Sequence, residues 1–201
     1  MRERWQRKDA GDVLLKVGAG YALLGTLATA LALALREGMP WVHPAPWLTL
    51  GELSSVITSG AMGLVLAGLV IASTRLAVAR LPAARRLHDD LRPVAQGLTL
   101  GHILLLAGLS SVGEELLFRG LLTPTLGVLA SSVLFGLAHQ VKGPSRWVWS
   151  GWAASVGIAL GAIFALTGSL VGPLVAHAVV NAVNLIYLRD HGASGSDRRA
   201  A

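Results

Sequence analysis

The chain has 201 residues, of which 53% are hydrophobic and only 14% carry a charge. An average soluble domain has about 25% charged residues, and a domain of this size buries only roughly 70% of its unfolded surface. The composition therefore predicts a membrane protein. Cysteine is absent, which excludes a disulfide-stapled scaffold and a thiolate metal site.

Six apolar stretches are expected to cross the membrane, because about 20 helical residues span a bilayer. In chain order they are residues 13–35, 53–79, 94–122, 124–141, 147–167 and 169–188. The third is long enough to tilt or break, and the fourth is at the short end of the spanning range. The predicted fold class is all-α, a polytopic transmembrane helix bundle of about six spans.

The charges between these stretches predict the orientation. Of the 17 Lys and Arg residues, 14 fall in alternate segments that include both termini, and 1 falls in the other segments. Basic residues collect on the cytoplasmic side, so both termini are expected in the cytoplasm. The alanine- and arginine-rich composition favours a bacterial inner membrane. Because the basic residues are scattered and no aromatic stacking platform accompanies them, no nucleic-acid partner is expected.

Two local patterns refine the helices. The first stretch follows a basic start, but its apolar run is too long for a signal peptide, so it is expected to remain as a helix. In the fifth stretch, Gly157, Gly161 and Ala165 form a small-residue stripe that predicts close packing on a neighbouring helix.

Three of the stretches carry polar side chains that a spanning helix does not need. The third contains Glu114, Glu115 and Arg119, and each charge near the membrane centre costs about 2.5–3.5 kcal/mol. Glu115 and Arg119 are one helical turn apart and can pair, which leaves Glu114 over. The other two stretches contribute His139, and His177 with Asn181 one turn later.

Each of these groups has a structural explanation when taken alone. A histidine in a span is often a hydrogen-bonded packing residue, and a Glu–Arg pair is often a clamp. The three groups together favour one shared polar site inside the bundle. The other histidines are assigned structural roles: His43, His88, His102 and His191.

The set suits hydrolysis of a peptide bond, which needs a base for water and donors for the oxyanion. Glu114 is the candidate base and His139 helps to hold the water. His177 and Asn181 are candidate oxyanion donors, while Glu115 with Arg119 fixes the local electrostatics. Without cysteine or a nucleophile-elbow serine, covalent catalysis is less favoured.

A metal ion is a separate question. Two histidines and a glutamate form a known catalytic zinc set, which makes Glu114, His139 and His177 candidate ligands. The helical motif with two histidines around a glutamate is absent, so a zinc cofactor remains open.

The three motifs resemble those of the CPBP intramembrane proteases, also called the Abi or CAAX-protease family. The family pattern is Glu-Glu-x-x-x-Arg, then Phe-x-x-x-His, then His-x-x-x-Asn. Here these read Glu114-Glu115 to Arg119, Phe135 to His139, and His177 to Asn181, with every position matched. The resemblance covers about residues 94–188.

The resemblance implies a multi-span peptidase that acts on a membrane-associated protein or peptide. Its eukaryotic relatives remove the last three residues of prenylated Cys-a-a-X proteins, and its bacterial relatives are more varied. It leaves the cofactor unsettled. On this basis we divide the chain into residues 1–93 (basic segment, two helices and a cytoplasmic linker), a catalytic core at 94–190 and a disordered tail at 191–201.

Two other functions stay open. One is a non-catalytic immunity or scaffold protein of the same fold, which shares every motif. The other is a small proton-coupled transporter, which the short chain and the lack of repeated halves disfavour.

The depth of His139 poses a geometric problem. Counted from an outer turn at Thr123, Glu114 lies nine residues away, about 13 Å, but His139 lies 16 residues away, about 24 Å. We expect a tilt, or a break near Gly113 or Gly120, to close this gap. We also expect the site to open toward the cytoplasm.

Overall fold

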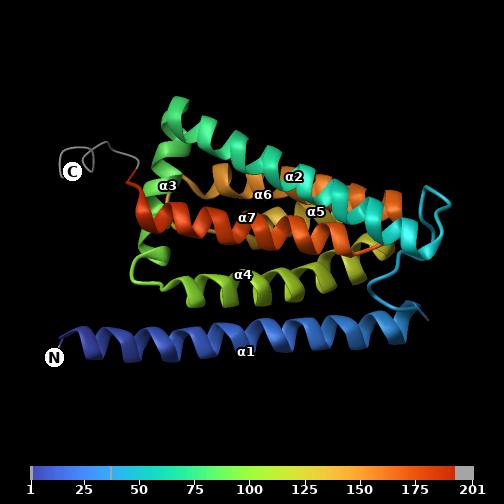
Figure 1. Cartoon of the computed structure of the whole chain (residues 1–201), viewed down its shortest axis with the longest axis horizontal. Helices are drawn as coiled ribbons and strands as arrows, with labels where there is room; N and C mark the ends of the chain where they lie inside the picture. The colour runs from blue at the N-terminus through green and yellow to red at the C-terminus, as the bar shows by residue number, and fades with distance from the viewer. Residues whose placement is uncertain (1, 37, 193–201) are drawn as a thin grey trace.

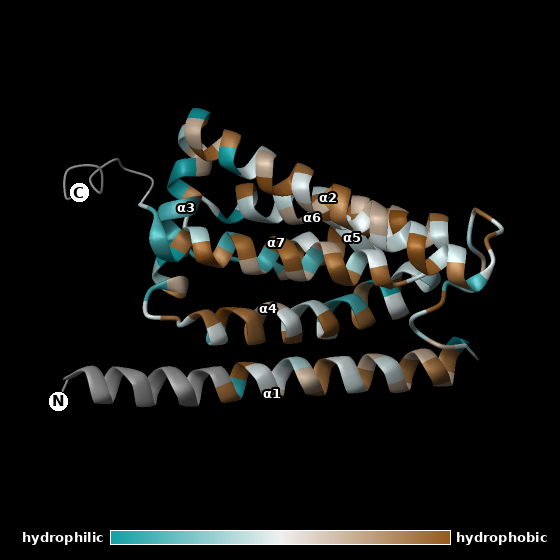
Figure 2. Ribbon diagram, in the orientation of Figure 1, coloured by the Kyte–Doolittle hydropathy of each residue, from teal (hydrophilic) through white to brown (hydrophobic). Residues whose placement is uncertain are grey.

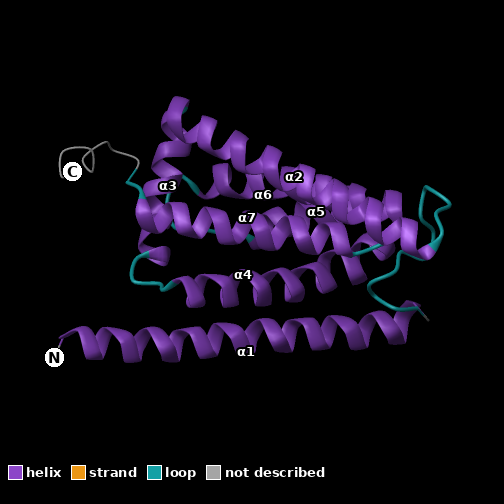
Figure 3. Ribbon diagram, in the orientation of Figure 1, coloured by secondary structure: helices purple, strands orange, loops and turns teal. Residues whose placement is uncertain are grey.

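The computed structural model describes residues 2–36 and 38–192, and within these ranges it contains helices and no strand. The all-α prediction is confirmed (Figure 3). The helices are α1 (Arg2–Arg36), α2 (Glu52–Arg80), α3 (Pro82–Ala95), α4 (Leu100–Glu115), the π-helix η1 (Leu116–Leu122), α5 (Thr123–Ala138), α6 (Arg146–Thr167) and α7 (Val171–Asp190). The tail expected at 191–201 lies outside the described residues from position 193 on.

The long helices lie side by side, and the short helix α3 crosses one end of the bundle (Figure 1). Helix α2 packs on α7, α5 packs on α6, and α4 packs on α7. Helix α1 is peripheral, because it packs mainly on α4 and η1. At the other end, the loop before α2 is held to the α6–α7 turn by the backbone bonds His43–Gly168 (2.9 Å) and Trp47–Ala165 (2.8 Å).

Five helical segments are long and apolar enough to cross a membrane. They are Leu15–Arg36, Glu52–Arg80, Leu100–Ala138, Arg146–Thr167 and Val171–Asp190. Large apolar side chains cover their outer faces, as at Val65 and Leu69, both 64% exposed. The hydrophilic residues collect around α3 at one end (Figure 2). A chain with this surface is a multi-pass membrane protein.

Small residues let the helices touch. A side chain at Gly63 or Gly172 would overlap the opposite backbone, so α2 and α7 meet with almost no space between them. On α6, a Cβ at Gly157 would lie 3.3 Å from the Ser132 Cβ, and one at Gly161 would lie 3.0 Å from Val128. The predicted small-residue stripe therefore packs on α5, as expected.

The chain reverses at Gly127, and not at Thr123 as the sequence suggested. Gly127 has φ 85° and ψ 165°, a conformation essentially limited to glycine, and it interrupts α5. The Thr123 and Ser131 hydroxyls meet across this turn at 2.9 Å. The sequence predicts a tilt, or a break near Gly113 or Gly120. Gly113 lies inside regular α4, whereas Gly120 lies in the π-helix η1, where the regular α-helix ends.

This reversal explains how His139 reaches the same depth in the membrane as Glu114. Glu114 lies 13 residues before Gly127 and His139 lies 12 residues after it. At about 1.5 Å per helical residue, both are at nearly the same depth. A turn four residues later than predicted thus brings the second motif level with the first.

Replacing Gly127 by Ala tests this turn. We expect Gly127→Ala to destabilise the fold by about 1–3 kcal/mol, because a Cβ strains this backbone conformation. The thermal unfolding midpoint in detergent micelles measures the loss. Gly151→Ala on α6 is the matched control, since its Cβ would meet nothing within 4 Å. Equal midpoints for the two variants would contradict the argument.

Candidate active site

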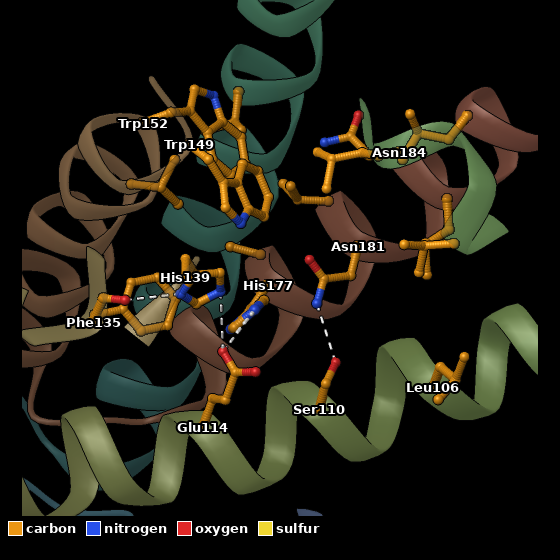
Figure 4. Close-up of a pocket in the computed structure, with 18 of the residues that line it drawn as sticks. Leu106, Ser110, Glu114, Phe135, His139, Trp149, Trp152, His177, Asn181 and Asn184 are labelled. Carbon is orange, nitrogen blue, oxygen red and sulfur yellow. Dashed lines mark hydrogen bonds and ion pairs between the residues drawn. The ribbon is translucent and has the colours of Figure 1, made fainter. Parts of the chain in front are cut away.

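The polar side chains of three segments meet in one cavity inside the bundle (Figure 4). Glu114 comes from the last turn of α4, His139 caps the end of α5, and His177 and Asn181 come from α7. The cavity has a volume of about 590 Å³, and most of its other lining residues are apolar. The structure thus brings together the groups that the sequence assigned to a shared site.

Glu114 faces both histidines. Its Oε2 lies 3.6 Å from the Nε2 atom of His139 and 3.8 Å from the Nε2 atom of His177. This oxygen is buried and has no hydrogen-bond partner in the described part of the chain. The carboxylate therefore keeps its accepting oxygen for whatever enters the cavity.

The second nitrogen of each ring fixes its tautomer. His139 Nδ1 lies 2.8 Å from the Phe135 carbonyl oxygen, and His177 Nδ1 lies 2.6 Å from Glu115 Oε1. Both partners only accept, so each Nδ1 carries a hydrogen, and each Nε2 faces Glu114. A water molecule or a proton between these atoms would bridge them.

A fully buried ion pair lies beneath this cluster. Arg119, 1% exposed, donates from Nη1 to Glu115 Oε1 over 2.9 Å and from Nη2 to the Gly157 carbonyl over 3.1 Å. Its guanidinium also lies 4.4 Å from the centre of the Phe135 ring. The predicted Glu115–Arg119 pairing is confirmed, and the same Glu115 oxygen holds His177.

Asn181 lies in the same cavity but is not bonded to Glu114. Its Nδ2 donates to the Ser110 hydroxyl over 3.1 Å, one turn before Glu114 on α4 (Figure 4). One of its two N–H groups is used in this contact, so the other is left for a ligand.

Several lining residues were not predicted from the sequence. Tyr21 of α1 lies beside Glu114, where its hydroxyl interacts with the carboxylate. Trp149 packs edge-on against His139 with ring centres 5.5 Å apart, and it stacks on Trp152. A tyrosine or tryptophan in an apolar stretch resembles an interfacial anchor, so the sequence carried no signal for these positions.

The donor set has the chemistry of a metal site, but its placement does not fit one. Histidines anchored through Nδ1 with Nε2 free are typical of metal ligands. Within the described ranges, however, no three His, Asp or Glu side chains are placed to hold a metal ion. The zinc cofactor stays a prediction, and the chemistry below uses the side chains alone.

Comparison with known proteins gives a family likeness for part of the chain. Residues 96–183 match the family described as "Type II CAAX prenyl endopeptidase Rce1-like". The matched segment is less than half of the chain and is similar to that family. A protein of Bacillus subtilis (strain 168), named "Uncharacterized protein YpbD", is 31% identical over 91 residues, which are 45% of this chain and 48% of that protein. The chain thus spans about half of this curated relative, and no solved structure matches it.

The Rce1-like segment contains all six predicted site residues, from Glu114 to Asn181. It runs from the linker after α3 to the middle of α7. Tyr21, and every cavity residue of α2, lie outside it. The matched segment thus supplies the polar cluster, and other helices complete the walls of the cavity.

The buried pair makes a stability prediction. Arg119→Met leaves the Glu115 carboxylate buried without a countercharge, which we expect to cost about 3–5 kcal/mol in the free energy of unfolding. Denaturant or thermal unfolding in micelles measures the loss. Adding Glu115→Gln should restore much of it, because the unpaired charge is then gone.

Arg146→Met serves as the control, since Arg146 is exposed at the start of α6. A double variant as unstable as Arg119→Met alone would show that charge pairing is not the cause.

Proposed function

We propose that this protein is an intramembrane endopeptidase that uses Glu114 as its general base. The observation that carries the proposal is the convergence of one buried carboxylate oxygen and two histidine Nε2 atoms, at 3.6 and 3.8 Å, in a mostly apolar cavity. The similarity of residues 96–183 to a peptidase family supports it independently.

In the proposed reaction, Glu114 takes a proton from a water molecule held beside His139 and His177. The water oxygen bonds to the peptide carbonyl carbon, and the free N–H of Asn181 stabilises the negative charge on the carbonyl oxygen. The C–N bond then breaks, and Glu114 returns the proton to the departing nitrogen. Donation by His177 to the oxyanion stays a prediction, because it requires protonation of both ring nitrogens.

The cavity supports a peptide of a membrane-bound protein as the substrate. Apolar side chains such as Leu66, Val70 and Val156 line it, and these favour an apolar segment over a charged one. The family name refers to prenylated CAAX proteins.

Glu114→Gln tests the proposal. We expect cleavage of a membrane peptide to fall by at least about 100-fold, within the range for loss of a general base, while folding is kept. The control is Glu52→Gln, which makes the same change at an exposed residue at the start of α2. Cleavage is followed by mass spectrometry of the products, with and without a metal chelator.

Equal rates with and without chelator are expected from a side-chain base. Full cleavage by Glu114→Gln would remove Glu114 from the reaction. A Glu114→Gln variant that keeps the protein's effect in cells would instead favour an immunity or scaffold role.

We also propose that the α3 end of the bundle faces the cytoplasm of a bacterial cell, because most basic residues cluster toward that side. The chain lacks cysteine, so single cysteines report orientation. On intact cells, an impermeant maleimide should label Ala45→Cys but reach Ala83→Cys only after permeabilisation. The reverse pattern would contradict this orientation.

A further inference from the structure

The polar wall of the cavity continues beyond the proposed catalytic cluster to Asn184. This residue lies on α7 one turn after Asn181, on the same face, and lines the same cavity (Figure 4). It lies just outside the Rce1-like segment, which ends at residue 183. The proposed reaction assigns it no role.

Arg75 of α2 fixes the orientation of the Asn184 amide. Its Nη1 donates to Asn184 Oδ1 over 3.1 Å, and its Nη2 donates to the Val183 carbonyl over 3.2 Å. The guanidinium also lies 3.6 Å from the centre of the Tyr187 ring. Arginine only donates, so it holds the oxygen of the amide and leaves the NH₂ group on the side away from itself.

The NH₂ group of Asn184 makes no hydrogen bond to the described residues, although it borders a mostly apolar cavity. Asn184 is half-buried, so this NH₂ group can donate to a ligand that enters the cavity. None of the described lining residues is Lys or Arg, and the nearby Arg75 is engaged by the Asn184 oxygen, the Val183 carbonyl and the Tyr187 ring. The acceptor that fits is therefore neutral, as a peptide carbonyl is.

A peptide in this cavity needs such donors. For cleavage, the chain has to be extended, and its carbonyl groups then lose their helical partners in an environment without bulk water. Asn184 is seven residues from His177, about 10 Å along α7. An extended peptide advances about 3.3 Å per residue, so this distance corresponds to about three residues.

We propose that Asn184, held by Arg75, is a substrate-binding residue that donates to a backbone carbonyl about three residues from the cleaved bond. This inference rests on the proposed peptidase function and adds a binding position to it. Arg75 is a positioning residue, since it acts through the amide that it orients.

Asn184→Asp is the sharpest variant, because it keeps the shape and the Arg75 contact but removes both N–H donors. The probe is an end-blocked fluorescent peptide of leucine, alanine and glycine. Its Kd is measured by anisotropy in micelles, with Glu114→Gln as the background so that it is not cut. We expect Asn184→Asp to raise the Kd about tenfold, the effect of one lost hydrogen bond to a buried carbonyl.

With Glu114 intact, Asn184→Asp should raise KM by a similar factor and change kcat by less than about twofold. The reason is that the lost hydrogen bond holds the bound substrate and the transition state equally well. Glu52→Gln exchanges an acid and an amide at an exposed residue outside the cavity and should leave Kd and KM unchanged. The thermal midpoint of Asn184→Asp should equal that of the parent protein, which separates binding from a structural role.

Unchanged Kd and KM in Asn184→Asp would overturn the inference. A free-acid peptide that binds tighter than the blocked one, and loses this gain in Asn184→Asp, would overturn the carbonyl assignment in favour of a terminal carboxylate. Weaker binding by Asn184→Asp in a protein that cleaves nothing would support the binding site and refute the peptidase function. Normal cleavage with a normal KM in Asn184→Asp would refute the binding site and support the peptidase function.

Discussion

The architecture depends on the cost of burying charge in a lipid-embedded protein. Glu115 and Arg119 are 0% and 1% exposed, and neither could remain there alone. Their pairing leaves guanidinium donors that must also be satisfied, and the Gly157 carbonyl of α6 accepts one of them. Gly157 can do so because it has no side chain, which lets α6 approach the pair. The ion pair is thus tied to α6 through the bond from Arg119 to the Gly157 carbonyl.

The same pair orders the polar atoms around the cavity. Glu115 accepts a hydrogen bond from Nδ1 of His177, and the Phe135 carbonyl accepts one from Nδ1 of His139. The Nε2 atoms of both rings are left facing Glu114. Glu114 Oε2 in the cavity is buried without a hydrogen-bond partner among the described residues, and so is Glu115 Oε2 in the ion pair. The amide of Asn184 is divided between its two ends, with its oxygen held by Arg75 and its nitrogen turned away.

The sequence predicted those parts of the site that depend on local spacing or on the membrane penalty. Helical spacing gave the Glu115–Arg119 pair, and the cost of polar groups in spans predicted that His139 and His177 share a cavity with Glu114. It could not identify Gly127 among 24 glycines, because only the tertiary contacts select φ 85° there. It could not pair Arg75 with Asn184, since the two are 109 residues apart.

The polar cluster and part of the cavity wall come from different parts of the chain. The polar cluster lies within residues 96–183, whereas Tyr21 of α1 and the Leu66 and Val70 walls of α2 lie outside this segment. Helix α1 packs mainly on α4 and η1, the two elements that carry Glu115 and Arg119. The contact from Arg75 to Asn184 joins α2 to the part of the cavity wall that lies next to the proposed catalytic cluster.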